Sequence, residues 1–111
     1  MAFAELVGHY RPDLVLMENV KEILCGRFAY YFSKAQRKLE SFGYKVKADV
    51  LDLSRYGVPQ RRLRAVAIGT LQGEINLPEP ILNEEEAVTV RQAIGHLNRI
   101  RPGEIDPEDR H

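Results

Sequence analysis

Two short stretches of this 111-residue sequence carry residues that could do acid–base and charge-stabilising chemistry. In the first, "LVLMENV", an apolar run over 14–17 is followed by Glu18, Asn19 and Val20. A carboxylate at the carboxyl end of a buried strand lies where open α/β sheets bind their ligands, and it can hold or transfer a proton there. Taken alone, such a stretch is more often simply a polar loop that begins after a strand.

The second stretch is "YGVPQRRLRAVAIG", residues 56–69. Gln60, Arg62 and Arg64 alternate, so an extended backbone directs all three to one side and directs Arg61 to the other. Most charge runs are solvated loops, but Arg64 lies within an apolar strand pattern and needs a partner there. These side chains are candidates for stabilising a developing negative charge.

Composition is that of an ordinary soluble globular protein, with 44% hydrophobic and 29% charged residues. The 16 Lys and Arg balance the 16 Asp and Glu, so any contact with nucleic acid must depend on a local patch. The single cysteine, Cys25, excludes an internal disulfide and fits a reducing compartment. No apolar run has the length of a membrane span and no signal-peptide layout is present, so we expect a cytoplasmic protein.

Hydrophobic periodicity predicts the elements that must position these residues. Helical spacing predicts helices over 1–10 and 28–42, and short apolar or alternating runs predict strands over 14–17, 44–50 and 63–68. The continuous run 14–17 is typical of a strand covered on both faces. The first strand–helix–strand unit predicts a parallel pair with a right-handed crossover, and the last two strands are predicted to be antiparallel.

The remainder of the chain has weaker signals. Residues 70–86 are rich in Pro and Glu and predict an irregular segment, whereas 89–97 predict a short helix capped by Thr89. Residues 101–111 contain two prolines and mixed charge, which indicates a loose end. The predicted fold is α/β: part of a sheet with one reversed strand and helices packed on it.

Together the two motifs resemble the DNA cytosine methyltransferases that modify carbon 5 of the ring. That family carries a Pro-Cys-Gln nucleophile loop, then Glu-Asn-Val, then Gln-x-Arg-x-Arg about forty residues later. Glu18-Asn19-Val20 and the stretch from Gln60 to Arg64 match the last two motifs in type, order and separation. The resemblance implies a partial Rossmann-like methyltransferase sheet, with residues 1–70 in the catalytic domain. Residues 71–111 would lead toward a target-recognition region that is missing from this sequence.

The resemblance also implies roles for the individual residues. The family transfers a methyl group from S-adenosylmethionine to a cytosine flipped out of double-stranded DNA, after a cysteine thiolate adds to carbon 6. Glu18 would face ring nitrogen 3, with a pKa raised by burial, and Arg64 would stabilise charge at the carbonyl oxygen. Arg62 would help to hold the base, and the substrate-binding positions would be Asn19, Val20 and Gln60.

Several family features are absent from this sequence. It has no Pro-Cys-Gln and no Gly-rich cofactor loop, and Cys25 follows the Glu-Asn-Val motif instead of preceding it. We therefore expect Cys25 to be a half-buried structural thiol and expect most of the cofactor pocket to be missing. His9, His96 and His111 have no metal-ligand spacing, so no metal site is predicted. We expect the isolated chain to be catalytically inactive.

Three alternatives remain open on the sequence. The chain could complement a partner that carries the missing upstream half. It could be a non-catalytic α/β module that binds nucleic acid through a patch of Arg55, Arg61, Arg62 and Arg64, or a remnant without function. If the chain is a fragment without the upstream half, one edge of the strand over 14–17 is unpaired, which predicts self-association or poor solubility.

Overall fold

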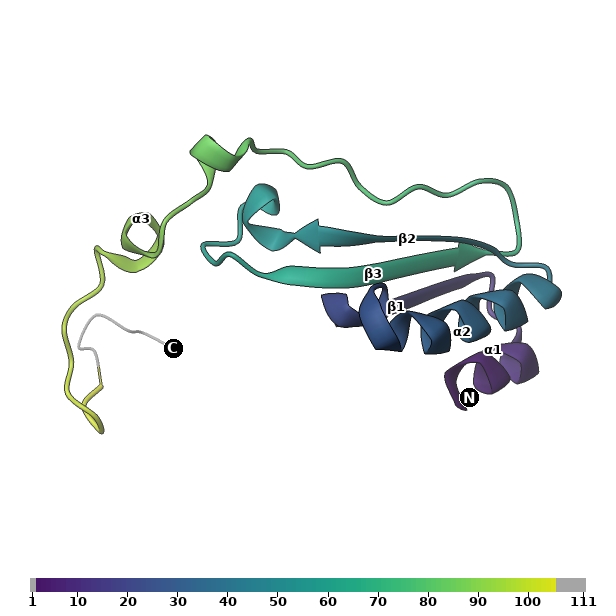
Figure 1. The fold of residues 1–111 in the computed structure, drawn as a ribbon. Helices are drawn as coiled ribbons and strands as arrows, with labels where there is room; N and C mark the ends of the chain where they lie inside the picture. Colours follow the sequence, from purple (N-terminus) through teal and green to yellow (C-terminus); the bar gives the residue numbers. More distant parts are fainter. Residues whose placement is uncertain (1, 106–111) are drawn as a thin grey trace.

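The computed structural model describes residues 2–105, which form a three-stranded sheet with two helices packed on one face (Figure 1). The helices and strands are, in chain order, α1 (Ala2–Tyr10), β1 (Leu14–Val20), α2 (Ala29–Ser41), β2 (Lys45–Asp52), β3 (Leu63–Thr70) and α3 (Val90–Ile94). Short 3-10 turns include η2 (Gly26–Phe28) before α2, η3 (Leu53–Tyr56) after β2 and η4 (Glu84–Glu86) before α3. The α/β class predicted from the sequence is confirmed.

The last strand of the chain is the middle strand of the sheet, whose order is β1-β3-β2. Both pairings are antiparallel, which confirms the predicted β2–β3 pair. Strands β1 and β2 run in the same direction but are not neighbours, so the predicted parallel pair is wrong because β3 lies between them. Pairing with β3 continues to Val20, which is opposite Arg64, so β1 extends three residues beyond the predicted strand end at Met17.

Only one face of the sheet is covered. Directly opposed residues of an antiparallel pair share a face, so Val15 and Gly69 lie together on the helix side and Leu16 and Ile68 on the other side. Val15 is 8% exposed, whereas Leu16 is 63% exposed. The expectation that the apolar run is covered on both faces is therefore wrong for the described residues, and we call the uncovered side the open face.

The core lies between the two helices and the helix side of the sheet. It contains Ala4 and Val7 of α1, Leu39 of α2, Val15 and Tyr44. The Tyr44 side chain is buried, and its hydroxyl donates to the Pro12 carbonyl at 2.6 Å, which satisfies the polar end of the ring.

Residues 71–83, which we call the strap, run back along the outer edge of β2 to η4 (Figure 1). The Tyr56 hydroxyl donates to the Pro78 carbonyl at 2.8 Å, and the Ile81 amide donates to the Arg55 carbonyl at 3.1 Å. Beyond the strap, the Thr89 hydroxyl accepts from the Gln92 amide, so the predicted helix cap is confirmed. Residues 106–111 of the predicted loose end lie outside the described residues.

Candidate functional site

Glu18 and Arg64 are brought together on the open face of the sheet. Glu18 is opposite Val66 and Arg64 is opposite Val20, so the two side chains are diagonal neighbours across the β1–β3 pair. Arg64 Nε lies 2.6 Å from Glu18 Oε1, and Arg64 Nη1 also donates to the Leu63 carbonyl at 2.9 Å. The expectation that Arg64 needs a partner within the strand is confirmed.

The two partners differ in how far they are removed from water. The Arg64 side chain is 19% exposed, but the Glu18 side chain is 58% exposed. The expectation that Glu18 is buried is therefore wrong for the described residues. The carboxylate is instead held by an ion pair with a cation that is itself mostly buried.

Asn19 and Val20 complete the end of β1. The Asn19 side chain shares the helix face with Ala65, and its Oδ1 accepts from the Val20 amide at 2.8 Å. Val20 lies on the open face and is 49% exposed. The structure therefore places Val20 beside the Glu18–Arg64 pair and assigns Asn19 a local backbone contact.

The loop over residues 53–62 presents the other two predicted site residues. The Leu53 amide donates to the Arg62 carbonyl at 2.9 Å, which closes the base of the loop. Gln60 and Arg62 are both exposed. Arg62 has the same strand parity as Arg64, so continuation of the β3 alternation assigns it to the open face.

Asp52 contacts several residues of this loop, a role that was not predicted from the sequence. Its Oδ1 accepts from the Ser54 hydroxyl at 2.8 Å and from the Ser54 amide at 3.1 Å, and its Oδ2 lies 3.8 Å from Arg61 Nε. The Ser54 hydroxyl and amide, and less strongly Arg61 and the Arg62 amide, hold the pKa of Asp52 below its ordinary value of 3.8, although desolvation acts in the opposite direction. The "DLS" pattern, an Asp two residues before Ser, is the signal that could have identified this cap.

Arg61 is directed away from Arg64, as the sequence predicts. Asp52 is opposite Leu63 and therefore lies on the face opposite that of Arg64. Contact with Asp52 thus draws Arg61 to the helix side of the sheet, although its side chain stays 82% exposed.

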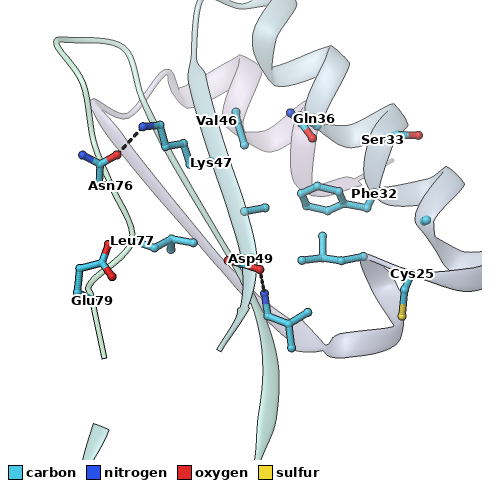
Figure 2. A pocket seen from close by; sticks show the side chains of 14 residues that line it. Cys25, Phe32, Ser33, Gln36, Val46, Lys47, Asp49, Asn76, Leu77 and Glu79 are labelled. Carbon is cyan, nitrogen blue, oxygen red and sulfur yellow. Dashed lines mark hydrogen bonds between the residues drawn. The ribbon is translucent and has the colours of Figure 1, made fainter. Parts of the chain in front are cut away.

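A cavity of about 860 Å³ lies elsewhere, along the outer edge of β2 (Figure 2). Phe32 and Gln36 of α2 form one wall and the strap forms the other, where Lys47 contacts Asn76. Glu18 and Arg64 do not line this cavity, so the candidate site is the open face and not this groove.

Cys25 is exposed at one end of the same cavity (Figure 2), and its Sγ donates to the Lys21 carbonyl at 3.5 Å. The expected half-buried thiol is therefore wrong. Although Cys25 follows Val20 by only five residues, it lies near β2, at the other edge of the sheet from β1.

Within residues 2–105 no three His, Cys, Asp or Glu side chains are grouped so that they could bind a metal ion. None of the helices in this part of the chain is long and apolar enough to cross a membrane.

Comparisons with known proteins point to one family. The model of the C-5 cytosine-specific DNA methylases matches residues 1–110. The type II methyltransferase M1.HphI of Haemophilus parahaemolyticus is 38% identical over 103 residues, covering 92% of this chain and 27% of that protein. The type II methylase M.HgiDII of Herpetosiphon aurantiacus is 36% identical over 95 residues, covering 86% and 27%.

A solved structure agrees with these sequence relatives. A protein described as a DNA modification methyltransferase encoded within a prophage of E. coli superposes with a TM-score of 0.70 at 27% identity. The match covers 88% of this chain and 29% of that one. The chain therefore spans between a quarter and a third of the length of the relatives that it matches.

Proposed function

Since this chain belongs to the C-5 cytosine-specific DNA methylase family, we propose that it forms the base-holding part of a DNA cytosine-5 methyltransferase. The observation that carries the proposal is the contact of 2.6 Å between Arg64 Nε and Glu18 Oε1 on the open face. An acid and a mostly buried arginine side by side are the groups required at ring nitrogen 3 and at the carbonyl oxygen of a cytosine under nucleophilic attack. The substrate is a cytosine flipped out of double-stranded DNA.

In this proposal each residue has a separate task. Arg64 Nη1 donates to the Leu63 carbonyl, which holds the guanidinium in place. In the proposal the guanidinium also donates to the carbonyl oxygen of the base, where negative charge develops. Glu18 faces ring nitrogen 3 and the exocyclic amine. Arg62 and Gln60, exposed on the adjoining loop, hold the base or its neighbours, while Val20 packs beside it and Asn19 fixes the end of β1.

S-adenosylmethionine is the methyl donor of the proposed reaction, but the residues of this chain do not fit a site for it. The sequence has no Gly-rich turn of the kind that binds the cofactor. It also lacks the Pro-Cys-Gln nucleophile, and Cys25 lies on the opposite edge of the sheet from Glu18. The tasks of this chain are therefore confined to holding the base and stabilising its charge, and the isolated chain is proposed to be inactive.

The proposed partner is a segment or chain that carries the nucleophile and cofactor motifs of a methyltransferase. No strand among residues 2–105 pairs with the outer edge of β1, whereas the strap flanks the outer edge of β2. Leu14 and Leu16 on the open face of β1 are 53% and 63% exposed. A further strand on this edge, with its own helices over the open face, would remove both features. Because the family model is that of DNA methylases and the two relatives named above are from bacteria, the proposed compartment is the cytoplasm.

A chimera tests the proposed function. The segment of M1.HphI that matches this chain is replaced by the matching residues of this chain, and methyl transfer from S-adenosylmethionine to DNA is measured. We expect activity in the chimera and none in the isolated chain. Glu18→Gln in the chimera should lower kcat by roughly 100-fold or more, as removal of a charge-stabilising donor or acid does.

Two results would contradict the proposal. One is a folded chimera without activity, and the other is a chimera in which Glu18→Gln transfers methyl groups as fast as the unsubstituted protein. DNA binding by the isolated chain that survives Glu18→Ala but is lost on substitution of Arg61 and Arg62 would instead support the non-catalytic binding module.

A further inference from the structure

The loop that carries Gln60 and Arg62 has no regular backbone structure that would hold it in one conformation. Its residues 57–62 form no helix or strand, and most of them are exposed. Gly57 has a φ of 85°, which only glycine adopts readily, so the chain reverses at this point. Contacts at the two ends of the loop must therefore fix where Gln60 and Arg62 lie, whereas Arg64 is placed by the pairing of β3 with β1 and β2.

Asp52 contributes several of those contacts from one carboxylate. Oδ1 caps the first turn of η3 through the Ser54 amide and hydroxyl, and Oδ2 reaches Arg61 on the returning limb of the loop. The Asp52 side chain is only 17% exposed. Its ion pair with Arg61 joins the two limbs at the point where the Leu53 amide and the Arg62 carbonyl also meet.

The opposite side of η3 is held by the strap. The Arg55 carbonyl accepts from the Leu82 amide at 3.0 Å, and Arg55 Nε donates to the Leu82 carbonyl at 3.3 Å. These bonds restrain η3 but do not touch the returning limb. Asp52 is thus the described side chain that links η3 directly to the three-residue stretch of Gln60, Arg61 and Arg62.

We propose that Asp52 is a positioning residue of the base-holding site. By holding Ser54 and Arg61, it fixes the loop so that Arg62 can reach the open face, where strand pairing already places Arg64. This inference rests on the proposed function for its catalytic consequence, although the coupling between Asp52 and the loop does not. Asp52 acts through Ser54 and Arg61 and touches no substrate.

Nuclear magnetic resonance of the whole 111-residue chain tests the coupling without DNA or cofactor. Asp52→Asn should shift the Arg61 Nε–Hε resonance and the amides of 54–62, and should lower their protection from hydrogen exchange by about tenfold. Asp49→Asn is the matched control, because Asp49 lies on the same strand and accepts only from the Val50 amide in the described contacts. Unchanged amides in Ala4 and Leu39 would show that the core of each variant is intact.

A comparison of the single and double variants shows whether Asp52 acts on the loop through Arg61. Because Asp52 also contacts Ser54, Arg61→Ala should reproduce only the changes at residues 60–62, and at these residues the double variant should change less than the sum of the two single effects. Loop resonances that are the same in Asp52→Asn as in the unsubstituted chain would overturn the proposal. Fully additive effects of the two substitutions would overturn it as well.

The methyltransferase chimera then tests the consequence for the reaction. Asp52→Asn should lower kcat by roughly 10- to 100-fold with a smaller change in KM for DNA, because small displacements of catalytic groups slow the chemical step. An active chimera that loses activity with Glu18→Gln but keeps it with Asp52→Asn would refute this inference alone. A folded but inactive chimera would refute the proposed function, and the resonance experiment would still decide the coupling.

Discussion

Arg64 Nε and Glu18 Oε1 lie 2.6 Å apart across the β1–β3 pair, although 46 positions separate the two residues in the chain. Each side chain comes from a different strand, and the diagonal placement follows from the register that sets Glu18 opposite Val66. Any shift of β3 by one residue would move Arg64 to the helix face and end the contact. The register of the sheet is therefore what builds the candidate site.

A double-mutant cycle measures this contact as a contribution to the free energy of unfolding. We expect Glu18→Gln and Arg64→Gln to couple by roughly 0.5–1 kcal/mol, because the geometry is good but the carboxylate is largely exposed. Urea unfolding of the four proteins gives the coupling energy. The Lys38–Glu5 pair, with an N–O distance of 3.4 Å and more exposed cation, serves as the control and should couple less. Equal coupling in both pairs would show that the geometry of the Glu18–Arg64 pair has no special value.

Local periodicity was enough to predict where the helices and strands lie. The alternation around Val46 and the helical stripe through Phe32 and Leu39 are each typical of an element that packs on a core. Strand β2 and helix α2 are present at the predicted places. Alternation also predicted that Arg61 and Arg64 point to opposite sides. These features depend only on residues close together in the chain, so they can be predicted from a single sequence.

Features that depend on distant parts of the chain were not predictable in the same way. An apolar strand pattern indicates that Leu16 is suited to burial, but it does not indicate whether another element of this chain covers that side chain. The insertion of β3 between β1 and β2 and the exposure of Glu18 likewise depend on which elements meet. Asp52 was missed for a different reason, because a cap at the start of a 3-10 turn looks like any polar residue that begins a loop.

Gly69 occupies a position on the helix face where the sheet has no room for a side chain. A Cβ added there would lie 2.8 Å from Val15 Cγ2 and 3.3 Å from Val46 Cγ2. Both neighbours are β-branched and have restricted χ1 angles, so neither can move away easily. We expect Gly69→Ala to lower the free energy of unfolding by about 1–3 kcal/mol, measured by urea denaturation.

Removal of the obstructing methyl groups provides the control for this substitution. In a Val15→Ala background, Gly69→Ala should cost clearly less than it does in the unsubstituted chain. The same cost in both backgrounds would mean that steric contact with Val15 is not the cause.

Asp52 should make the stability of the protein depend on pH in acid. Hydrogen bonds from Ser54 lower the pKa of this carboxyl in the folded chain below its ordinary value of 3.8. The unfolded chain therefore takes up the proton first, so the stabilisation is fully present above pH 3.8 and is lost as the pH falls through the folded pKa. The unfolding free energies of the unsubstituted chain and Asp52→Asn should converge over that range.

Denaturation curves from pH 7 down to pH 2.5 measure this convergence. Arg55, Glu79 and Glu84 border the same region, but they are present in both proteins and cancel in the difference. Asp49→Asn reports the effect of losing one negative charge from the same strand. A constant difference between the unsubstituted chain and Asp52→Asn across this range would show that Asp52 is not held by these bonds.

The outer edge of β1 should cause the isolated chain to self-associate. The Leu71 amide donates to the Asp13 carbonyl and continues the β1–β3 ladder, so odd-numbered residues of β1 face β3 and the even-numbered ones direct their amides outward. Asn19 Oδ1 accepts from the outward amide of Val20, but Leu14 and Leu16 have no such local acceptor among the described contacts. Two unpaired positions with exposed apolar side chains form an edge that favours pairing with another chain.

A charge at the centre of this edge should prevent the association. Light scattering at increasing protein concentration should show dimers or larger species for the unsubstituted chain and a monomer for Leu16→Lys, because a lysine would be carried into the paired interface. Ile81→Lys is the matched control, since Ile81 is 72% exposed but belongs to the strap, far from β1 in the sheet order. A chain that stays monomeric at high concentration would contradict the prediction. Loss of association in Ile81→Lys as well would show that general apolar exposure, and not the β1 edge, is responsible.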